Sequence, residues 1–328
     1  EKNISNKYIL DKWKKKLLVF PRHILEPIYI FFSFFSFSKN FIYFVNEKNP
    51  VGKILVSPGK KIDDSELLQQ YDPFINFTKK EISDAEMILS EFNISQYKAI
   101  ICFAGRSKSY KSEIFETARN SNVLNQLNGI NKLIDQGYIA FRLGTKEQIK
   151  LPKNYPNQVI DFAFSSKRSD FLDLYLVSKC LFFISSQSGI NEMATIMRKK
   201  KVIIDFIDFE SLYLQNLFYI PIILPKKIYS KKKNNFLPYK EIFNFPFKEI
   251  NNLEKLKDKN FEIVDNSPKE IEEAILNMDN CIRGELDLKK ELKNQKEFWD
   301  IFNVNYGFRP KQTIICPSFF HANLDLFN

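Results

Sequence analysis

The chain has 328 residues, 44% of them hydrophobic, and a formal net charge of +10. This length predicts one large or two medium-sized domains with an ample core, and the hydrophobic content excludes a disordered chain. Lys, Ile, Asn and Phe are the residues that an AT-rich genome favours, so the positive charge alone is weak support for a nucleic-acid partner. The lysines also scatter along the chain apart from two clusters, whereas a nucleic-acid binder gathers its charge on one face. We therefore expect no nucleic-acid partner.

The four cysteines do not form a metal or disulfide framework. They lie far apart, at Cys102, Cys180, Cys281 and Cys316, and no Cys-x-x-Cys pair is present. Only two histidines could add an imidazole ligand, so a zinc site is not expected. Cys102 and Cys180 sit in apolar runs and are expected to be buried thiols of a protein in a reduced, cytoplasmic compartment.

The N-terminal region combines basic and apolar residues. The first residue is Glu1 rather than Met, so we expect a piece of a longer gene product or a processed chain. Residues 28–38, IYIFFSFFSFS, are apolar but shorter than the roughly 20 residues that a membrane-spanning helix needs. Because KWKKK at 12–16 precedes them, we expect residues 1–96 to be a membrane-surface and acceptor region, peripheral on the inner face of the cytoplasmic membrane. A buried core helix explains the apolar run nearly as well.

Apolar runs alternate with amphipathic segments through the middle of the chain. Strands are predicted at 53–57, 98–105, 138–144, 159–165, 181–186 and 201–206, and helices at 64–70, 81–92, 121–137, 170–180, 190–199 and 267–278. Strands that alternate with helices at this spacing predict a doubly wound α/β sheet of the Rossmann type, which we place in residues 97–285. Residues 286–328 are expected to be a helical tail that packs on the N-terminal region.

Three local patterns add detail to this assignment. Asp84 is a candidate cap for the helix at 81–92. The sequence SPKE at 267–270 predicts a capping box with proline at the first helical position. The basic stretch 226–233, KKIYSKKK, is predicted to be a flexible linker.

Residues 182–194, FFISSQSGINEMA, predict a strand, a tight turn and the start of a helix. Such a turn aims several backbone N–H groups at one place, which suits an anion such as a phosphate. An ordinary Ser N-cap is the alternative explanation. Ligands of doubly wound sheets bind beyond the carboxyl ends of the strands, where Arg106, Arg142 and Arg168 are also predicted to lie. That coincidence favours the anion site.

These residue types suit a nucleotide-sugar diphosphate, which carries about two negative charges and gains one more on the leaving nucleotide. An enzyme that works without a metal stabilises this charge with arginines, hydroxyls and helix N-termini. Arg142 and Arg168 are the candidate catalytic residues. The candidate substrate-binding residues are Arg106, Tyr110, Asp170, Ser186, Gln187, Ser188 and Gly189. No metal or other cofactor is expected.

Other activities have weaker support in the sequence. Asp208-Phe209-Glu210 is the nearest match to the Asp-x-Asp pattern of metal-dependent sugar transferases, but a polar strand exit also explains it. Neither a Walker P-loop nor a GxGxxG pattern occurs, which argues against an ATPase and a dehydrogenase. SSQSG lacks the leading Gly of a serine-hydrolase elbow.

The pieces FAGRSKSYK, RNSN, GYIAFRLG, LPKKIY, YKEIF, NSPKEIEEAILNM and FWDIF, and above all residues 159–194, carry a resemblance. The chain resembles bacterial glycosyltransferases of surface-polysaccharide and O-antigen gene clusters, and is similar to the donor-binding half of fucosyltransferase-like enzymes. Those enzymes have a GT-B fold, in which an Arg at a strand end and a Ser/Gly-rich turn face the nucleotide diphosphate. The resemblance implies a GT-B-like protein that transfers a sugar, without a metal and with inversion, to a surface-polysaccharide or lipid-linked glycan.

The chain departs from the family pattern at two acidic positions. Asn122 stands where the family has an acid after Arg-Asn-x, and Ser107 follows Arg106 where the family has Asp. The region before Lys98 is also short for a full acceptor domain. These departures keep a second hypothesis open, a catalytically silent module that binds a nucleotide sugar or a glycan. A basic RNA-binding protein is a third hypothesis, which predicts salt-sensitive binding to any polyanion.

Overall fold

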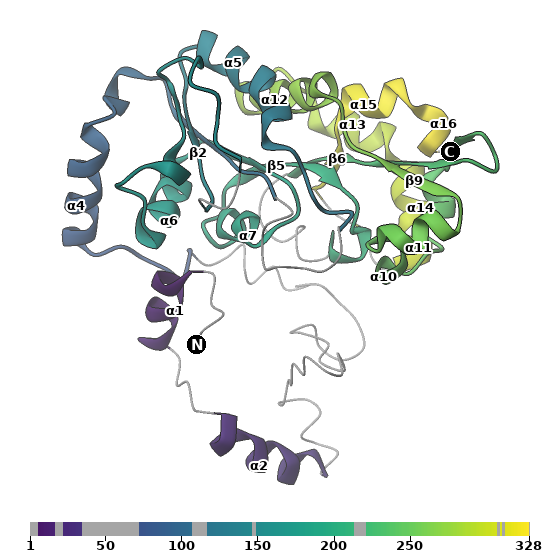
Figure 1. The fold of residues 1–328 in the computed structure, drawn as a ribbon, viewed down its shortest axis with the longest axis horizontal. Helices are drawn as coiled ribbons and strands as arrows, with labels where there is room; N and C mark the ends of the chain where they lie inside the picture. The colour runs from purple at the N-terminus through teal and green to yellow at the C-terminus, as the bar shows by residue number, and fades with distance from the viewer. Residues whose placement is uncertain are drawn as a thin grey trace. The chain divides into compact units, whose positions relative to one another are not determined.

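The computed structural model describes residues 6–16, 22–34, 72–106, 117–145, 149–212, 221–306, 309 and 312–327 (Figure 1). The chain divides into two compact units, Glu1–Ile75 and Asn76–Asn328, here called unit 1 and unit 2. The predicted strand at 53–57, the predicted helix at 64–70 and the candidate residue Tyr110 lie outside the described residues.

Unit 1 contains two described helices, α1 (Lys7–Lys14) and α2 (Arg22–Ser33). Asn6 caps α1, because its Oδ1 accepts a hydrogen bond from the Ile9 N–H at 2.9 Å. The Trp13 ring stacks on Phe74 with 4.7 Å between centroids. Among the helices that the structure describes, none has both the length and the apolar character to cross a membrane.

Unit 2 is built on a seven-stranded parallel sheet. Its strands are β1 (Ile100–Phe103), β2 (Ile139–Arg142), β3 (Val159–Ile160), β4 (Phe182–Ser185), β5 (Lys200–Phe206), β6 (Pro221–Pro225) and β10 (Ile314–Ile315). Their order is β10-β6-β5-β4-β1-β2-β3, and every pairing is parallel. The chain runs outward from β1 to β3, returns to β4 on the other side of β1, and continues outward to β6. The strand order therefore reverses between β1 and β4, as in Rossmann-like sheets.

Helices cover both faces of this sheet (Figure 1). One face carries α5 (Leu127–Asp135), α12 (Pro268–Arg283) and α15 (Pro317–Ala322), and the other carries α6 (Asp170–Lys179) and α7 (Gly189–Ile196). Right-handed crossovers that run in opposite directions from β1 place their helices on opposite faces. Because both faces are covered, the central strands are mostly apolar rather than alternating, with Lys201 and Asp205 of β5 as buried exceptions. The other helices described in unit 2 are α4 (Lys79–Ser90), α9 (Tyr239–Ile242), α10 (Phe247–Ile250), α11 (Leu253–Asp258), α13 (Leu288–Asn294), α14 (Lys296–Tyr306) and α16 (Leu324–Phe327). The 3-10 turns are η2 (Ile94–Gln96), η4 (Val123–Gln126), η5 (Phe162–Phe164) and η6 (Phe209–Ser211).

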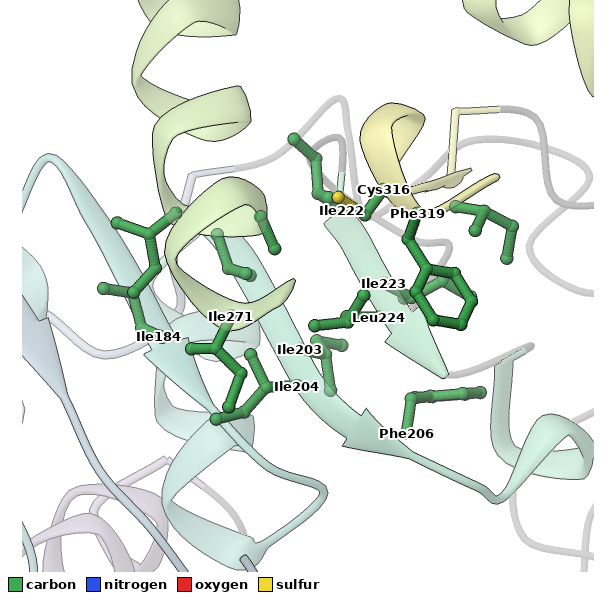
Figure 2. Packing of buried hydrophobic residues seen from close by; sticks show 14 of the residues in the cluster. Ile184, Ile203, Ile204, Phe206, Ile222, Ile223, Leu224, Ile271, Cys316 and Phe319 are labelled. Carbon is green, nitrogen blue, oxygen red and sulfur yellow. The ribbon is translucent and has the colours of Figure 1, made fainter. Parts of the chain in front are cut away.

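The core of unit 2 lies between the sheet and its helices (Figure 2). Side chains from β4, β5, β6 and α12, such as Ile184, Ile203, Leu224 and Ile271, belong to this core and have no exposed surface. Burial of each such side chain contributes about 1.5–3 kcal/mol. All four cysteines are buried and free, as expected for Cys102 and Cys180.

A second, antiparallel sheet shows that the predicted linker at 226–233 was wrong. Its strands are β7 (Lys227–Ser230), β8 (Asn235–Phe236) and β9 (Phe261–Val264), in the order β8-β7-β9. Ile228 and Ser230 alternate inward and are 1% exposed. The many lysines around this segment hid the period-two pattern of a strand, and we therefore predicted a solvated linker.

Two further boundaries differ from the predictions. The cap of α4 is Thr78 and not Asp84, because Thr78 Oγ1 accepts from the Glu81 N–H at 3.2 Å and Glu81 Oε2 accepts from the Thr78 N–H at 2.6 Å. The strand predicted to end at residue 165 ends at Ile160, and η5 follows it. The capping box at the start of α12 is confirmed.

Candidate functional site

The candidate site lies at the switch point between β1 and β4. The two strands pair in parallel, with Phe103 opposite Ile184, and the Ala104 N–H donates to the Ile184 carbonyl at 2.9 Å. Their carboxyl ends therefore meet at the same edge, where Arg106 follows β1 and the Ser186–Gly189 turn follows β4. This is the place where open α/β sheets bind ligands.

The turn leaves the first turn of α7 open to a ligand. Ser188 is the N-cap residue, but its side chain makes no capping hydrogen bond and its Oγ donates to the Ser186 carbonyl at 3.3 Å. The α7 N-terminus thus keeps the partial positive charge that favours an anion. A Cβ added at Gly189 would meet no atom within 4 Å. Among the residues that the structure describes, none therefore prevents a Cβ at this position.

Ser186 holds a buried hydroxyl beside this turn. Its Oγ has no hydrogen-bond partner within the described part of the chain, although the residue has no exposed surface. The neighbouring Ser185 Oγ, in contrast, donates to Asn191 Oδ1 at 3.1 Å. An unsatisfied buried hydroxyl costs about 1–3 kcal/mol, which makes Ser186 a candidate for a contact that only a ligand completes.

Gln187 is engaged by the protein itself. Its Oε1 accepts from the Ile207 N–H at 2.9 Å and from the Asp208 N–H at 2.8 Å. Its Nε2 donates to the Asp208 carbonyl at 3.2 Å and to Ser211 Oγ at 3.0 Å. The side chain that the sequence suggested for substrate binding thus fastens the turn to the segment after β5.

Arg142 has no exposed surface and is ion-paired. Its Nη1 contacts Asp161 Oδ1 at 2.8 Å, and its Nη2 donates to the Ile149 carbonyl at 3.0 Å. Asp161 follows β3, which lies on the side of β2 away from β1 and β4. The described contacts of Arg142 are therefore directed away from the Ser186–Gly189 turn.

Arg168 pairs with two acids of the first turn of α6. Its Nε and Nη2 donate to Asp173 Oδ2 at 3.0 and 2.8 Å, and its Nη2 also donates to Asp170 Oδ1 at 3.1 Å. Burial raises the pKa of Asp173 to about 6, although Arg168 lowers it. Asp170, a candidate substrate contact, is thus an ion-pair partner of a candidate catalytic residue.

A buried polar network at the same edge was not anticipated from the sequence. Asp205 interrupts β5 with a φ of +50°, at a register shift between Ile203 and Phe206. Its Oδ2 accepts from the Ser121 hydroxyl at 2.6 Å, and its Oδ1 accepts from the Asn266 N–H at 2.8 Å. Burial raises the pKa of Asp205, although nearby Lys226 lowers it. In the sequence, the only sign of this buried network was a single acid inside the apolar run KVIIDF.

Asp208 lies directly after this strand, as the N-cap of η6. Its Oδ1 accepts from the Ser211 N–H at 3.2 Å. Burial raises the pKa of Asp208 to about 6, Glu210 raises it further and Arg119 lowers it. In the described ranges, no group of three or more His, Cys, Asp and Glu side chains is placed to hold a metal ion.

Comparison with protein-family models, with curated proteins and with solved structures gave no significant match for this chain. The structure therefore defines the class on its own. The chain is an α/β protein with a seven-stranded, Rossmann-like parallel sheet and a small antiparallel sheet.

Proposed function

We propose that this chain is a glycosyltransferase that moves a sugar from a nucleotide-sugar donor to a surface-polysaccharide or lipid-linked glycan. The observation that carries the proposal is the open Ser186–Gly189 turn at the start of α7, beside Arg106 at the β1/β4 switch point. The motifs that resemble bacterial glycosyltransferases cover the same turn.

Sugar transfer requires that the negative charge on the departing nucleoside diphosphate be stabilised. The bond between the sugar C1 and the donor phosphate oxygen breaks, a bond from C1 to the acceptor oxygen forms, and the acceptor proton passes to a base. In this proposal the N–H groups of the first turn of α7, the Ser186 hydroxyl and Arg106 bind the diphosphate oxygens. No metal is required for these contacts.

The roles of Arg142 and Arg168 depend on a rearrangement. Each guanidinium already contacts a carboxylate, Asp161 for Arg142 and Asp173 for Arg168. Either arginine would have to exchange that carboxylate for the diphosphate to act in catalysis. This observation favours the second candidate function, a module that binds a nucleotide sugar or a glycan without turnover.

The finer architecture belongs to the same proposal. Unit 2 would be the donor-binding half of a GT-B-like protein, and unit 1 would contribute the acceptor region. The exposed apolar side chains of α2 support an attachment of unit 1 to the inner face of the cytoplasmic membrane.

The test separates binding from turnover. The full chain is incubated with a panel of nucleotide sugars in EDTA, and released nucleoside diphosphate and bound nucleotide are both measured. Release that survives EDTA supports the transferase, and binding without release supports the silent module. Activity restored only by manganese or magnesium would contradict the metal-independent mechanism.

Gly189→Val tests whether the nucleotide binds at the Ser186–Gly189 turn. A branched side chain there would block the approach of the phosphates, and its Cβ would meet no atom of the described residues within 4 Å. We expect a folded protein that no longer binds nucleotide. Retained nucleotide binding by Gly189→Val would contradict the location of the site.

A further inference from the structure

A second pocket opens at the carboxyl edge of the sheet, between the loop after β1 and the antiparallel sheet. Its volume is about 580 Å³, and Asn120, Lys226, Lys231, Lys257 and Phe261 are among its lining residues. None of the residues of the Ser186–Gly189 turn lines it. An isolated antiparallel bridge between Thr117 and Asn252 joins the loop to the start of α11, so two separate parts of the chain frame the pocket.

Lys226 is the fixed charge of this pocket. It follows β6 and is 2% exposed, and its Nζ donates to the Asn120 carbonyl at 2.7 Å and to Asp265 Oδ1 at 2.6 Å. Asp265 itself is 55% exposed on its side chain. A lysine ammonium has three N–H donors, and these two contacts use two of them. The buried ammonium is therefore held in place by two hydrogen bonds and retains one N–H donor.

Two more lysines reach the same pocket from different elements. Lys231 follows β7 and lies 3.5 Å from Glu262, with both side chains about 60% exposed, so this pair is weak in water. Lys257 comes from α11 and has no ion-pair partner among the residues that the structure describes. Three lysines against Glu262 and Asp265 leave a formal charge of +1. The pocket is thus suited to an anion.

The remaining wall is apolar. Leu253, Leu256 and Phe261 line the same pocket as the charged groups. An aromatic ring beside aliphatic side chains accepts the C–H face of a sugar ring, while ammonium groups form charge-assisted hydrogen bonds with a phosphate or carboxylate. A simple ion would leave the apolar residues without a contact, and a neutral sugar would leave the ammonium groups without a charged partner.

We propose that this pocket binds a sugar that carries an anionic group, a phosphoryl or a carboxyl. This inference rests on the proposed function. The pocket receives the acidic sugar of the glycan acceptor, while the diphosphate of the donor binds at the Ser186–Gly189 turn. Lys226 supplies the fixed contact, and Lys231 and Lys257 close on the anion from the rim.

The test measures binding of glucose 1-phosphate, glucuronate and neutral glucose to the full chain by titration calorimetry at about 150 mM salt. We expect both anionic sugars to bind more tightly than glucose. The stronger of the two identifies the natural anion as phosphoryl or carboxyl. Equal affinity for all three would overturn the proposal.

Two exposed lysines make a matched pair of variants. Lys257→Gln removes a lining charge, and Lys232→Gln removes an equal charge from the exposed turn between β7 and β8, outside the pocket. We expect the Kd of the preferred anionic sugar to rise roughly five- to tenfold in Lys257→Gln and to stay unchanged in Lys232→Gln. An equal rise of the Kd in both variants would show that only long-range charge attracts the sugar, and would refute its binding in this pocket.

Gly189→Val separates this inference from the proposed function. The variant should lose nucleotide binding and keep the affinity for the anionic sugar. Loss of both affinities would place the anionic sugar in the nucleotide site and overturn the second pocket. Loss of neither would contradict the proposed nucleotide site while leaving the second pocket standing.

Discussion

The Ser186 hydroxyl distinguishes a ligand site from an ordinary helix cap at the scale of single residues. Because Oγ has no hydrogen-bond partner among the described residues, Ser186→Ala removes no hydrogen bond that the structure describes. Since the unsatisfied hydroxyl no longer has to be buried, we expect the free energy of unfolding to stay the same or to rise by up to about 1–3 kcal/mol, and the affinity for a nucleoside diphosphate to fall roughly fivefold. Urea unfolding and calorimetry measure the two quantities.

Ser185→Ala is the matched control for that variant. It removes a buried hydrogen bond to Asn191 Oδ1 and should lower the free energy of unfolding by about 1 kcal/mol or more. If Ser186→Ala proves as destabilising as Ser185→Ala and binds nucleotide normally, the Ser186 hydroxyl serves the fold alone.

Arg142 provides the second prediction at this scale. Arg142→Ala leaves Asp161 with the Leu151 N–H at 2.9 Å but without its ion-pair partner. We expect the free energy of unfolding to fall by about 3–5 kcal/mol, and activity to fall with the amount of folded protein. A stable Arg142→Ala protein whose turnover is about 100-fold lower would restore the catalytic role of this arginine.

The sequence predicted where these side chains stand along the chain, but not what they contact. Arg142 and Ser186 were both placed correctly at strand ends, because a strand and its polar exit are local features. The partner of Arg142 lies 19 residues away, and no local pattern shows on which side of β2 the guanidinium turns. Burial of Lys226 depends on loops from three parts of the chain, so its surroundings were equally invisible.

At the scale of elements, the close approach of α5 to α12 rests on Gly129. A Cβ there would lie 2.6 Å from Ile275 Cδ1 and 3.1 Å from Glu272 Cα. Alanine gains about 1 kcal/mol in helix propensity, but overpacking costs about 1–3 kcal/mol. Since the Glu272 backbone cannot move aside as a side-chain end can, we expect Gly129→Ala to be destabilising by about 1 kcal/mol in urea unfolding. Gly189→Ala, which meets nothing within 4 Å, is the control and should cost nothing.

The segment after β5 should respond to pH through Asp208. Burial raises the pKa of its carboxyl to about 6, above the value of an unfolded chain. The folded state therefore binds this proton more tightly. Stability from this group is present below about pH 4 and is lost as the pH rises through about 6.

Asp208→Asn removes that titration and can still accept from the Ser211 N–H. We expect the variant to gain roughly 1–2 kcal/mol over the wild type at about pH 8 and little at about pH 4. Urea unfolding at both pH values measures the difference. An equal change in stability at the two pH values would show that the Asp208 carboxyl does not titrate as described.

Elements were predictable where both faces of the sheet are covered. β1 and β4 are short apolar runs, β5 is apolar at 202–204 and at Phe206 despite Asp205, and α5 shows a clear apolar stripe, so the sequence predicted each of them. β10 has two residues and exists only because it pairs with β6, and no periodicity can reveal a strand so short. Local patterns therefore identified β1 to β5, including the edge strand β3, but the inner strand β6 (PIILP) was missed, and β10 and the antiparallel sheet depended on tertiary pairing.

At the scale of the whole molecule, the two units have different surfaces. Most large apolar residues described in unit 2 are buried around its two sheets. In unit 1, Ile24, Ile28, Ile30 and Phe31 of α2 and Phe34 directly after it are 45–81% exposed. Lys14, Lys15 and Lys16 are exposed at the end of α1 and beyond it. Apolar side chains beside a basic cluster are typical of a segment that lies on an anionic bilayer.

The full chain should accordingly bind vesicles that contain phosphatidylglycerol more tightly than vesicles of phosphatidylcholine alone. Each basic residue near such a surface contributes about 1 kcal/mol, so replacing Lys14, Lys15 and Lys16 by Gln should weaken co-sedimentation on the order of 100-fold. The same three changes at 231–233, a run of three exposed lysines in unit 2, alter the net charge equally and should have little effect. Phe31→Ser with Phe34→Ser should weaken binding through the apolar face alone. If the variants at 14–16 and 231–233 lose binding to the same extent, net charge explains the attraction and α1 and α2 form no membrane surface.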